Sequence, residues 1–196
     1  MAKENFSLVN HIWQYDDLLD YRVVTNLISY LNKIDKQNYF KDAQIIGKEK
    51  EHLNKEIRNT KNFALTNLNE SKTDQHWCNL LLATFRKALN KYTQAYLPGI
   101  AIQDVIDIQA LKYVEGGHYV PHVDDHFDIP RTVSMIYRLN NDFKGGDLVF
   151  SLQGKEMLRL KPKPNNLVVW PSNFLYPHSV EPVTEGMRWS IVAWAR

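Results

Sequence analysis

Apolar side chains follow two different spacings along the chain, and the change falls near Pro98. Before Pro98, apolar residues recur every three or four positions in two segments, which is the period of an amphipathic helix. We expect one helix over about residues 16–33 and a second over about 73–96, with Thr73–Asp74 as its N-cap. The apolar positions are Leu18, Leu19, Val23, Leu27 and Leu31 in the first helix, and Trp77, Leu80, Leu81, Phe85, Leu89 and Tyr92 in the second.

After Pro98 the pattern changes to short apolar or alternating runs separated by glycine and proline, which is typical of strands and turns. The runs lie at about 104–115, 118–124, 131–139, 147–152, 155–160, 166–170, 177–182 and 188–195. Eight such strands predict a mainly β fold of the α+β class, a double-stranded β-helix or jelly roll, with the helices packed on one sheet. Between the helices, residues 47–70 are polar, and only 57–65 read as a strand.

Length, charge and cysteine content narrow the class of protein. At 196 residues we expect one domain, with 1–97 as a helical support region and 98–196 as the jelly-roll core. A net charge of +2 gives no reason to expect nucleic acid or a membrane as partner, and Cys78, the only cysteine, excludes an internal disulfide. No signal peptide or apolar run of membrane-spanning length is visible, so we expect a cytoplasmic protein. No pattern indicates an oligomeric state.

One histidine pattern suggests a metal site. His122 and Asp124 are two residues apart, which on a strand places both side chains on one face. His178 would join them from a later strand, and two imidazoles with one carboxylate form the facial triad of non-haem iron oxygenases. The alternative is a plain hydrogen-bonded pair of His122 and Asp124 without a metal.

Arg188 follows the distal histidine by ten residues. A buried arginine needs a partner, and an acidic co-substrate would supply one. Ser190 faces the same way on a strand and can add a hydrogen bond. The alternative is a surface arginine paired with Glu181 or Glu185.

Motifs in a fixed order extend from Tyr113 to Trp194, over roughly half of the chain. They read YVEGGHYVPHVD at 113–124, TVSMIYRLN at 132–140, FKGGDL at 143–148, NLVVWPS at 166–172, HSVEPV at 178–183 and GMRWSIVAW at 186–194. In this order they resemble the 2-oxoglutarate- and Fe(II)-dependent oxygenases, in particular the prolyl 4-hydroxylase-like branch. The first motif is similar to that branch's Tyr-x-x-Gly-x-x-Tyr-x-x-His-x-Asp.

The resemblance implies Fe(II) bound by His122, Asp124 and His178, with 2-oxoglutarate and O2 as co-substrates and ascorbate as reductant. The activity implied is hydroxylation of a C–H bond, with release of succinate and CO2. The residues implied to contact 2-oxoglutarate are Arg188, Tyr113, Ser190 and Tyr119. Both tyrosines can also be read as core aromatics.

One position departs from the family. Animal oxygen-sensing prolyl hydroxylases have a tyrosine directly before a Leu-Asn pair, and this chain has Arg138 there, preceded by Tyr137. Adjacent side chains on a strand point to opposite faces. Either Arg138 points inward and adds a second positive charge, or Arg188 holds the co-substrate alone.

The resemblance further implies that a peptide or protein containing proline is the substrate. Its contacts would be Arg131 and Trp194, with weaker support for Arg58; each can also be a strand-end or core residue. The superfamily's nucleic-acid demethylases have a second arginine where this chain has Trp194, which argues against them. A hydroxylase of a free amino acid or another small metabolite remains an alternative, as does a non-catalytic metal-binding jelly roll.

Overall fold

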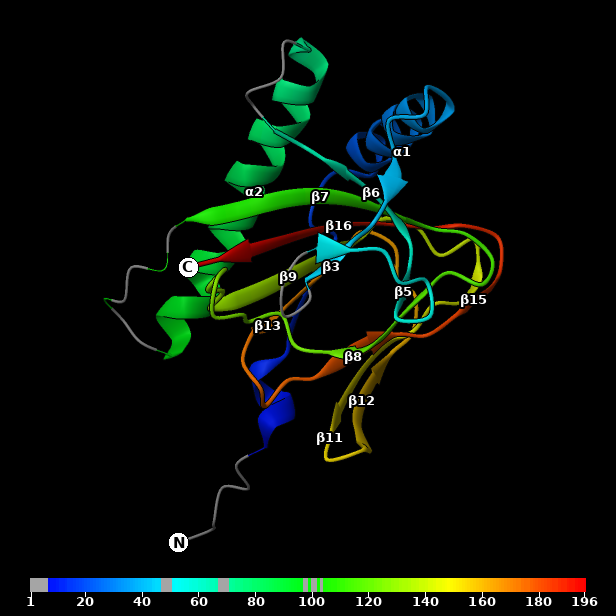
Figure 1. The fold of residues 1–196 in the computed structure, drawn as a ribbon. Coiled ribbons are helices and arrows are strands. Elements are labelled where there is room, and N and C mark those ends of the chain that lie inside the picture. The colour runs from blue at the N-terminus through cyan, green and yellow to red at the C-terminus, as the bar shows by residue number, and fades with distance from the viewer. Residues whose placement is uncertain (1–6, 47–50, 67–70, 97–98, 100–101, 103) are drawn as a thin grey trace, which may run out of the picture.

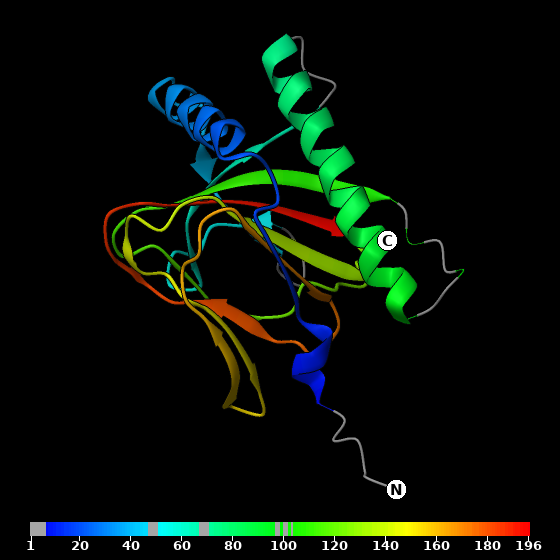
Figure 2. The same cartoon turned by 180° about the vertical axis from the view of Figure 1, so that it is seen from behind.

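The computed structural model describes residues 7–46, 51–66, 71–96, 99, 102 and 104–196. Two antiparallel sheets face each other, and both long helices lie along the outer face of the larger one (Figures 1 and 2). Neither helix is long and apolar enough to cross a membrane, within the part of the chain that is described. This arrangement confirms the expected jelly roll with helices packed on one sheet.

The larger sheet has seven strands in the order β1-β13-β9-β16-β7-β6-β2. Their bounds are Trp13–Asp16 (β1), Asn166–Pro171 (β13), Val133–Arg138 (β9), Arg188–Ala195 (β16), Val105–Tyr113 (β7), Lys61–Ala64 (β6) and Lys41–Asp42 (β2). Three of these strands come from the first half of the chain, so that half contributes to the sheet as well as to the helices that cover it.

The smaller sheet has five strands in the order β12-β11-β14-β8-β5. Their bounds are Lys155–Leu160 (β12), Leu148–Leu152 (β11), His178–Val180 (β14), His118–His122 (β8) and Arg58–Asn59 (β5). Two strand pairs complete the fold, namely Ile45–Ile46 (β3) with Glu51–His52 (β4), and Lys144–Gly145 (β10) with Val183–Glu185 (β15). The last position of β10 needs glycine, because Gly145 has φ 71° and a Cβ there would lie 2.2 Å from the Pro182 carbonyl oxygen.

Helix α1 covers Tyr21–Lys36 and helix α2 covers Lys72–Tyr96, while a short 3-10 turn, η1, spans Leu8–His11. The predicted start of the first helix at residue 16 was wrong. Asp20 caps α1 by accepting a hydrogen bond from the Arg22 backbone N–H at 2.7 Å, and the residues before it pair with β13 as strand β1. The second helix agrees with its prediction, except that it begins at Lys72, so that Thr73 and Asp74 lie within its first turn.

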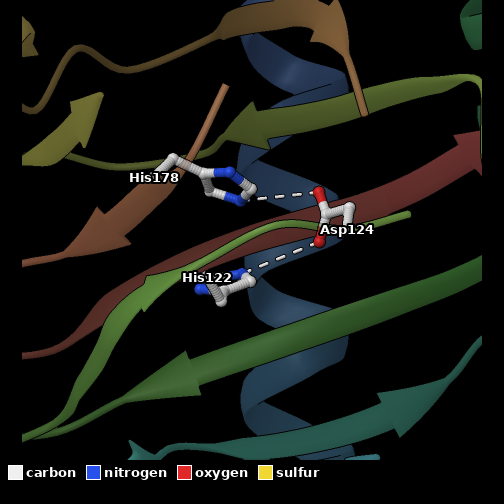
Figure 3. A group of neighbouring side chains, drawn as sticks. All are labelled: His122, Asp124 and His178. Atoms are coloured by element: carbon white, nitrogen blue, oxygen red, sulfur yellow. Dashed lines mark ion pairs between the residues drawn. The ribbon is translucent and has the colours of Figure 1, made fainter. Parts of the chain in front are cut away.

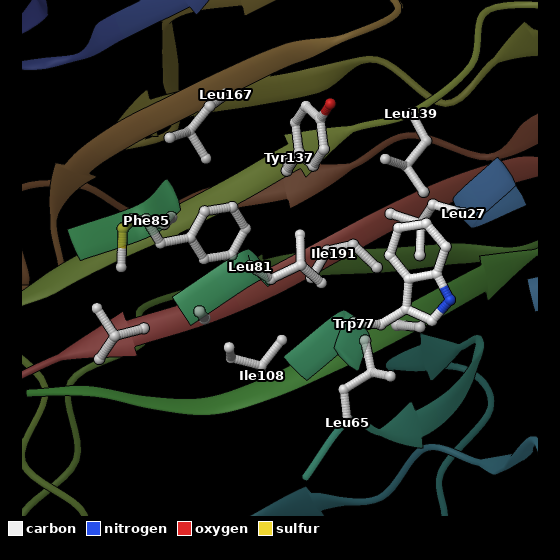
Figure 4. Close-up of a cluster of buried hydrophobic side chains, with 14 of the residues drawn as sticks. Leu27, Leu65, Trp77, Leu81, Phe85, Ile108, Tyr137, Leu139, Leu167 and Ile191 are labelled. Atoms are coloured by element: carbon white, nitrogen blue, oxygen red, sulfur yellow. The ribbon is translucent and has the colours of Figure 1, made fainter. Parts of the chain in front are cut away.

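Two apolar clusters fill the fold. One lies between the helices and the outer face of the large sheet and includes Leu27, Leu81, Phe85, Ile108 and Tyr137 (Figure 4). The other lies between the two sheets, where inward-facing residues of both meet. Because alternate residues of each strand face the two clusters, the inner face of the large sheet is free to carry polar side chains into the space between the sheets.

Candidate metal centre

His122, Asp124 and His178 converge between the two sheets (Figure 3). The two histidines are register partners on neighbouring strands β8 and β14. Their Nε2 atoms lie 3.6 Å and 3.4 Å from the Asp124 carboxylate oxygens, for His122 and His178 respectively. One ligand atom from each residue lies within 4.8 Å of the others. Asp124 was expected on the same strand as His122, but it lies two residues after the end of β8. Its side chain still points to the same side as that of His122.

Both imidazoles are oriented by backbone carbonyl groups. His122 Nδ1 lies 2.9 Å from the Val120 oxygen, and His178 Nδ1 lies 3.1 Å from the Tyr176 oxygen. A carbonyl oxygen only accepts hydrogen bonds, so each Nδ1 carries the proton and each Nε2 keeps its lone pair. Both lone pairs are then available as metal ligands.

The charge states also suit a divalent metal. Burial lowers the pKa of His178 to about 4, so that its ring is neutral at pH 7. Burial alone would raise the pKa of Asp124, but interactions with His178 and His122 and a hydrogen bond from Ser134 outweigh it, and the net pKa lies below its ordinary value. Metal ligands must be a neutral imidazole and an ionised carboxylate. The three residues therefore fit an Fe(II) site.

Asp124 is held by a hydroxyl group from the opposite sheet. Ser134 of β9 donates to Asp124 Oδ2 at 2.7 Å, and its hydroxyl lies 2.7 Å from that of Ser172. Ser134 is fully buried. Nothing in the sequence marks Ser134, because serine is common, and only its inward position on the strand would have indicated it.

A cavity of about 920 Å³ opens from the metal ligands along the inner face of the large sheet. The cavity is lined by the three metal-binding residues and by most of the predicted contact residues, namely Tyr113, Tyr119, Arg131, Trp194 and Arg58. Apolar side chains such as Leu111, Ile136 and Val192 form part of its wall. The described structure thus brings residues from across the chain to one space.

Arg188 lies beside this cavity and is 2% exposed. Its Nη1 donates to Ser190 at 3.0 Å, and its guanidinium lies 4.9 Å from the ring centre of Tyr113, which lines the cavity. Its Nη2 has no hydrogen-bond partner. Burial lowers the pKa of Arg188, so a carboxylate partner would stabilise its charged form.

Arg138 and Tyr137 differ from Arg188 in their environments. Tyr137 faces the helices and donates to Asn165 at 2.6 Å (Figure 4). Arg138 is buried, but its nitrogens donate to Asn166, to the Lys161 carbonyl at 2.7 Å and to Gln14 at 3.0 Å. Its guanidinium is already held by strand neighbours, whereas that of Arg188 is not.

Unpartnered donors gather around the cavity. In the described part of the chain, four buried side-chain atoms lack a hydrogen-bond partner: Arg58 Nε, Arg131 Nε, Trp170 Nε1 and Arg188 Nη2. All four carry N–H groups, three belong to residues that line the cavity, and the fourth lies beside it. Such groups are costly when unsatisfied. The cavity therefore suits ligands rich in oxygen acceptors, such as carboxylates and carbonyls.

Two arginines at the mouth lie on aromatic rings. The Arg131 guanidinium is 3.7 Å from the ring centre of Trp194, and that of Arg58 is 4.9 Å from the ring centre of Tyr119. The Tyr119 ring stacks in turn on His122 at 3.5 Å. These cation–π contacts hold both guanidinium groups close to the metal ligands.

The fold and these side chains define a class of protein: a jelly roll with a two-His-one-carboxylate site between its sheets. A family model described as "2OG-Fe(II) oxygenase superfamily" matches residues 108–196, which include the triad and Arg188. This match over residues 108–196 confirms the family likeness predicted from the motifs.

Named relatives agree with this assignment. A PKHD-type hydroxylase of Colwellia psychrerythraea is 34% identical over 86 residues, which are 40% of this chain and 37% of the relative. One of Rippkaea orientalis is 32% identical over 93 residues, 42% of this chain and 39% of the relative. The matches thus span under two fifths of these relatives' lengths.

Solved structures share the fold over most of the chain. A prolyl-4-hydroxylase of Pseudomonas putida has a TM-score of 0.72 and 23% identity, covering 95% of this chain and 92% of its own. A prolyl hydroxylase of Trichoplax adhaerens, solved with a peptide fragment of a hypoxia inducible factor, has a TM-score of 0.78 and 20% identity, covering 95% and 83%. At these identities the likeness establishes the fold.

Proposed function

We propose that this protein is a 2-oxoglutarate- and Fe(II)-dependent dioxygenase that hydroxylates a C–H bond of a peptidyl proline. His122, Asp124 and His178 would hold the iron, and Arg188 would bind the far carboxylate of 2-oxoglutarate. With both bound, one oxygen atom of O2 enters the product and the other enters succinate as CO2 is released, and ascorbate serves as the reductant. The observation that carries the proposal is the gathering of unpartnered N–H donors around the cavity that holds the triad.

The chain's own residues have three tasks in this reaction. The triad and Ser134 fix the ligand atoms of the metal. Arg188 and Ser190 orient the co-substrate from the other sheet, on strand β16. The apolar wall beside the metal keeps water from the oxidant, which protects the reaction from side paths.

A peptide substrate is favoured by the mouth of the cavity. Arg131 and Arg58 each have a buried, unpartnered Nε–H beside the metal ligands, and the backbone carbonyls of a peptide are acceptors for such groups. Trp194, whose ring lies under the Arg131 guanidinium, also lines the cavity and adds apolar surface that suits a proline ring. The likeness to the Trichoplax hydroxylase, whose structure holds a peptide, adds support at the level of fold.

A hydroxylase of a free amino acid is the second candidate. One observation favours it: Arg131 and Asp107 both line the cavity and lie 3.8 Å apart, so the site offers a cation and an anion to a zwitterion. The α-carboxylate would approach Arg131 and the α-ammonium would approach Asp107.

One experiment separates these candidates. The protein is incubated with Fe(II), 2-oxoglutarate and ascorbate, with a proline-rich peptide in one sample and free L-proline in the other. Mass spectrometry should show a gain of one oxygen on the peptide, and succinate should form, whereas His178→Ala should give neither. A clear preference for L-proline would refute the peptide assignment. If no sample releases succinate in an iron-dependent way, the assignment as an enzyme is refuted, and a non-catalytic metal-binding module is the remaining alternative.

A further inference from the structure

Strand β7 contains a bulge that faces the cavity. Along its pairing with β16, Val192 is opposite Gln109 and Trp194 is opposite Ile106. Two residues of β7, Asp107 and Ile108, therefore lie opposite a single residue of β16, which is the definition of a β-bulge. Asp107 adopts φ 52°, in the left-handed region.

The bulge decides which way Asp107 points. Val105 and Ile108 pack in the cluster below the helices, and Gln109 lines the cavity. In a regular strand, alternation would turn Asp107 to the helix side together with Val105, where a carboxylate would be buried among apolar groups. With the extra residue, Asp107 lines the cavity instead.

At the cavity Asp107 meets Arg131. Its Oδ2 lies 3.8 Å from Arg131 Nη2, and their side chains are 47% and 12% exposed respectively. Arg131 also donates from Nη1 to the Asp124 carbonyl at 3.3 Å and lies over the Trp194 ring. The guanidinium thus has neighbours on three sides, and its buried Nε–H lacks a hydrogen-bond partner.

We propose that Asp107 is a positioning residue that holds Arg131 over the Trp194 ring, so that the Nε–H of Arg131 can bind a backbone carbonyl of the substrate. This inference rests on the proposed peptide substrate. The backbone supports it, because a left-handed conformation costs a non-glycine residue free energy, and glycine would relieve that cost at this bulge. The chain nevertheless has an aspartate at this strained position, and its carboxylate lies next to Arg131.

Stability and substrate binding should therefore change in opposite directions. Asp107→Gly relieves the strain and removes the carboxylate, so the melting temperature should rise on the order of 2 °C. The KM for a proline-rich peptide that the enzyme hydroxylates should rise about two- to fivefold, because an ion pair this exposed contributes little free energy. The kcat should change less. Asp107→Asn should raise KM similarly without the gain in melting temperature. A residue with a merely structural role would not separate the two effects.

Asp17 offers a matched control. It is an exposed aspartate with φ 50°, and it does not line the cavity. Asp17→Gly should raise the melting temperature like Asp107→Gly but leave the peptide KM unchanged. In an Arg131→Ala background, Asp107→Asn should have no further effect on KM, because the carboxylate acts through Arg131.

A second readout needs no substrate. In ¹⁵N NMR spectra, the Arg131 Nε–H signal should be sharp in the wild type and broadened in Asp107→Asn as the guanidinium gains motion. An unchanged Arg131 signal, or an unchanged peptide KM in both Asp107 variants, would overturn the proposal. If the wild type hydroxylates no peptide, the proposed function fails, and the NMR signal still decides whether Asp107 positions Arg131.

Discussion

Replacing Arg188 with methionine tests the co-substrate pocket where its evidence is strongest. Arg188 is 2% exposed, and within the described residues its guanidinium donates a hydrogen bond only to Ser190. A buried charge without a counter-ion destabilises the folded protein, and methionine fills a similar volume without charge. We expect ligand-free Arg188→Met to be about 1–4 kcal/mol more stable than wild type, by analogy with replacements of buried charged groups by apolar ones. At about 2–4 °C per kcal/mol, differential scanning calorimetry resolves such a change.

The same substitution should nearly abolish 2-oxoglutarate binding. Loss of one partner of a buried, charge-assisted contact costs about 2–5 kcal/mol. Since about 1.4 kcal/mol corresponds to a tenfold change, the Kd for 2-oxoglutarate should increase by a factor between about 30 and a few thousand. Calorimetric titration of the Mn(II)-loaded protein with 2-oxoglutarate measures this, and the KM from succinate release should follow it. Arg188→Lys, which keeps the charge but loses the planar fork, should lie between.

Arg138→Met is the matched control, since it also removes a buried guanidinium from the neighbouring strand. The Arg138 nitrogens already donate to Asn166, Lys161 and Gln14, so this variant should lose stability and change the Kd for 2-oxoglutarate far less. Burial and the nearby charge of Arg188 lower the pKa of Arg138 to about 10. An unchanged Kd in Arg188→Met would refute the assignment and transfer the anchoring role to Arg138.

Three further predictions concern the rest of the site. His122→Ala, Asp124→Ala and His178→Ala should each abolish turnover and weaken metal binding, with Asp124→Ala mildest because water or chloride can replace a carboxylate; full succinate production by His178→Ala would contradict the triad. Ser134→Ala removes the hydroxyl that orients Asp124 and should weaken Mn(II) affinity about 10- to 100-fold, measured by titration; an unchanged affinity would show that Asp124 needs no support. Trp194→Ala and Arg131→Ala should reduce peptide hydroxylation while metal and 2-oxoglutarate binding stay nearly intact; equal losses in all three measurements would place these residues in the structural core.

Local periodicity predicted the elements well where each depends on its own apolar face. All eight predicted strand runs appear, and α2 lies within one residue of its expected start. The prediction failed where distant pairing decides. Leu18 and Leu19 have helical spacing to Val23, yet residues 13–16 pair with β13 at the other end of the chain, and α1 starts only after Asp20.

The roles of Arg138 and Asp107 could not be read from the sequence for a similar reason. The partners of Arg138 include Asn166 and Gln14, which are 28 and 124 residues away. Alternation places Asp107 on the helix side, and only the bulge reverses this. A glycine would have indicated a bulge, whereas aspartate gives no such signal.

The arrangement of the site across two sheets narrows the ligands it can bind. His122 and His178 belong to the five-stranded sheet, whereas Arg188 and Ser190 belong to the seven-stranded sheet that faces it. Facing sheets pack about 10 Å apart, so the metal ligands and the unpartnered guanidinium cannot be reached by one small carboxylate. A ligand that satisfies both must carry acceptors at two ends separated by a short chain, which is the chemistry of a dicarboxylic keto acid. The fold sets the gap between these residues, whereas the motif gives only their order in the sequence, so the geometry supports the proposed co-substrate on separate grounds.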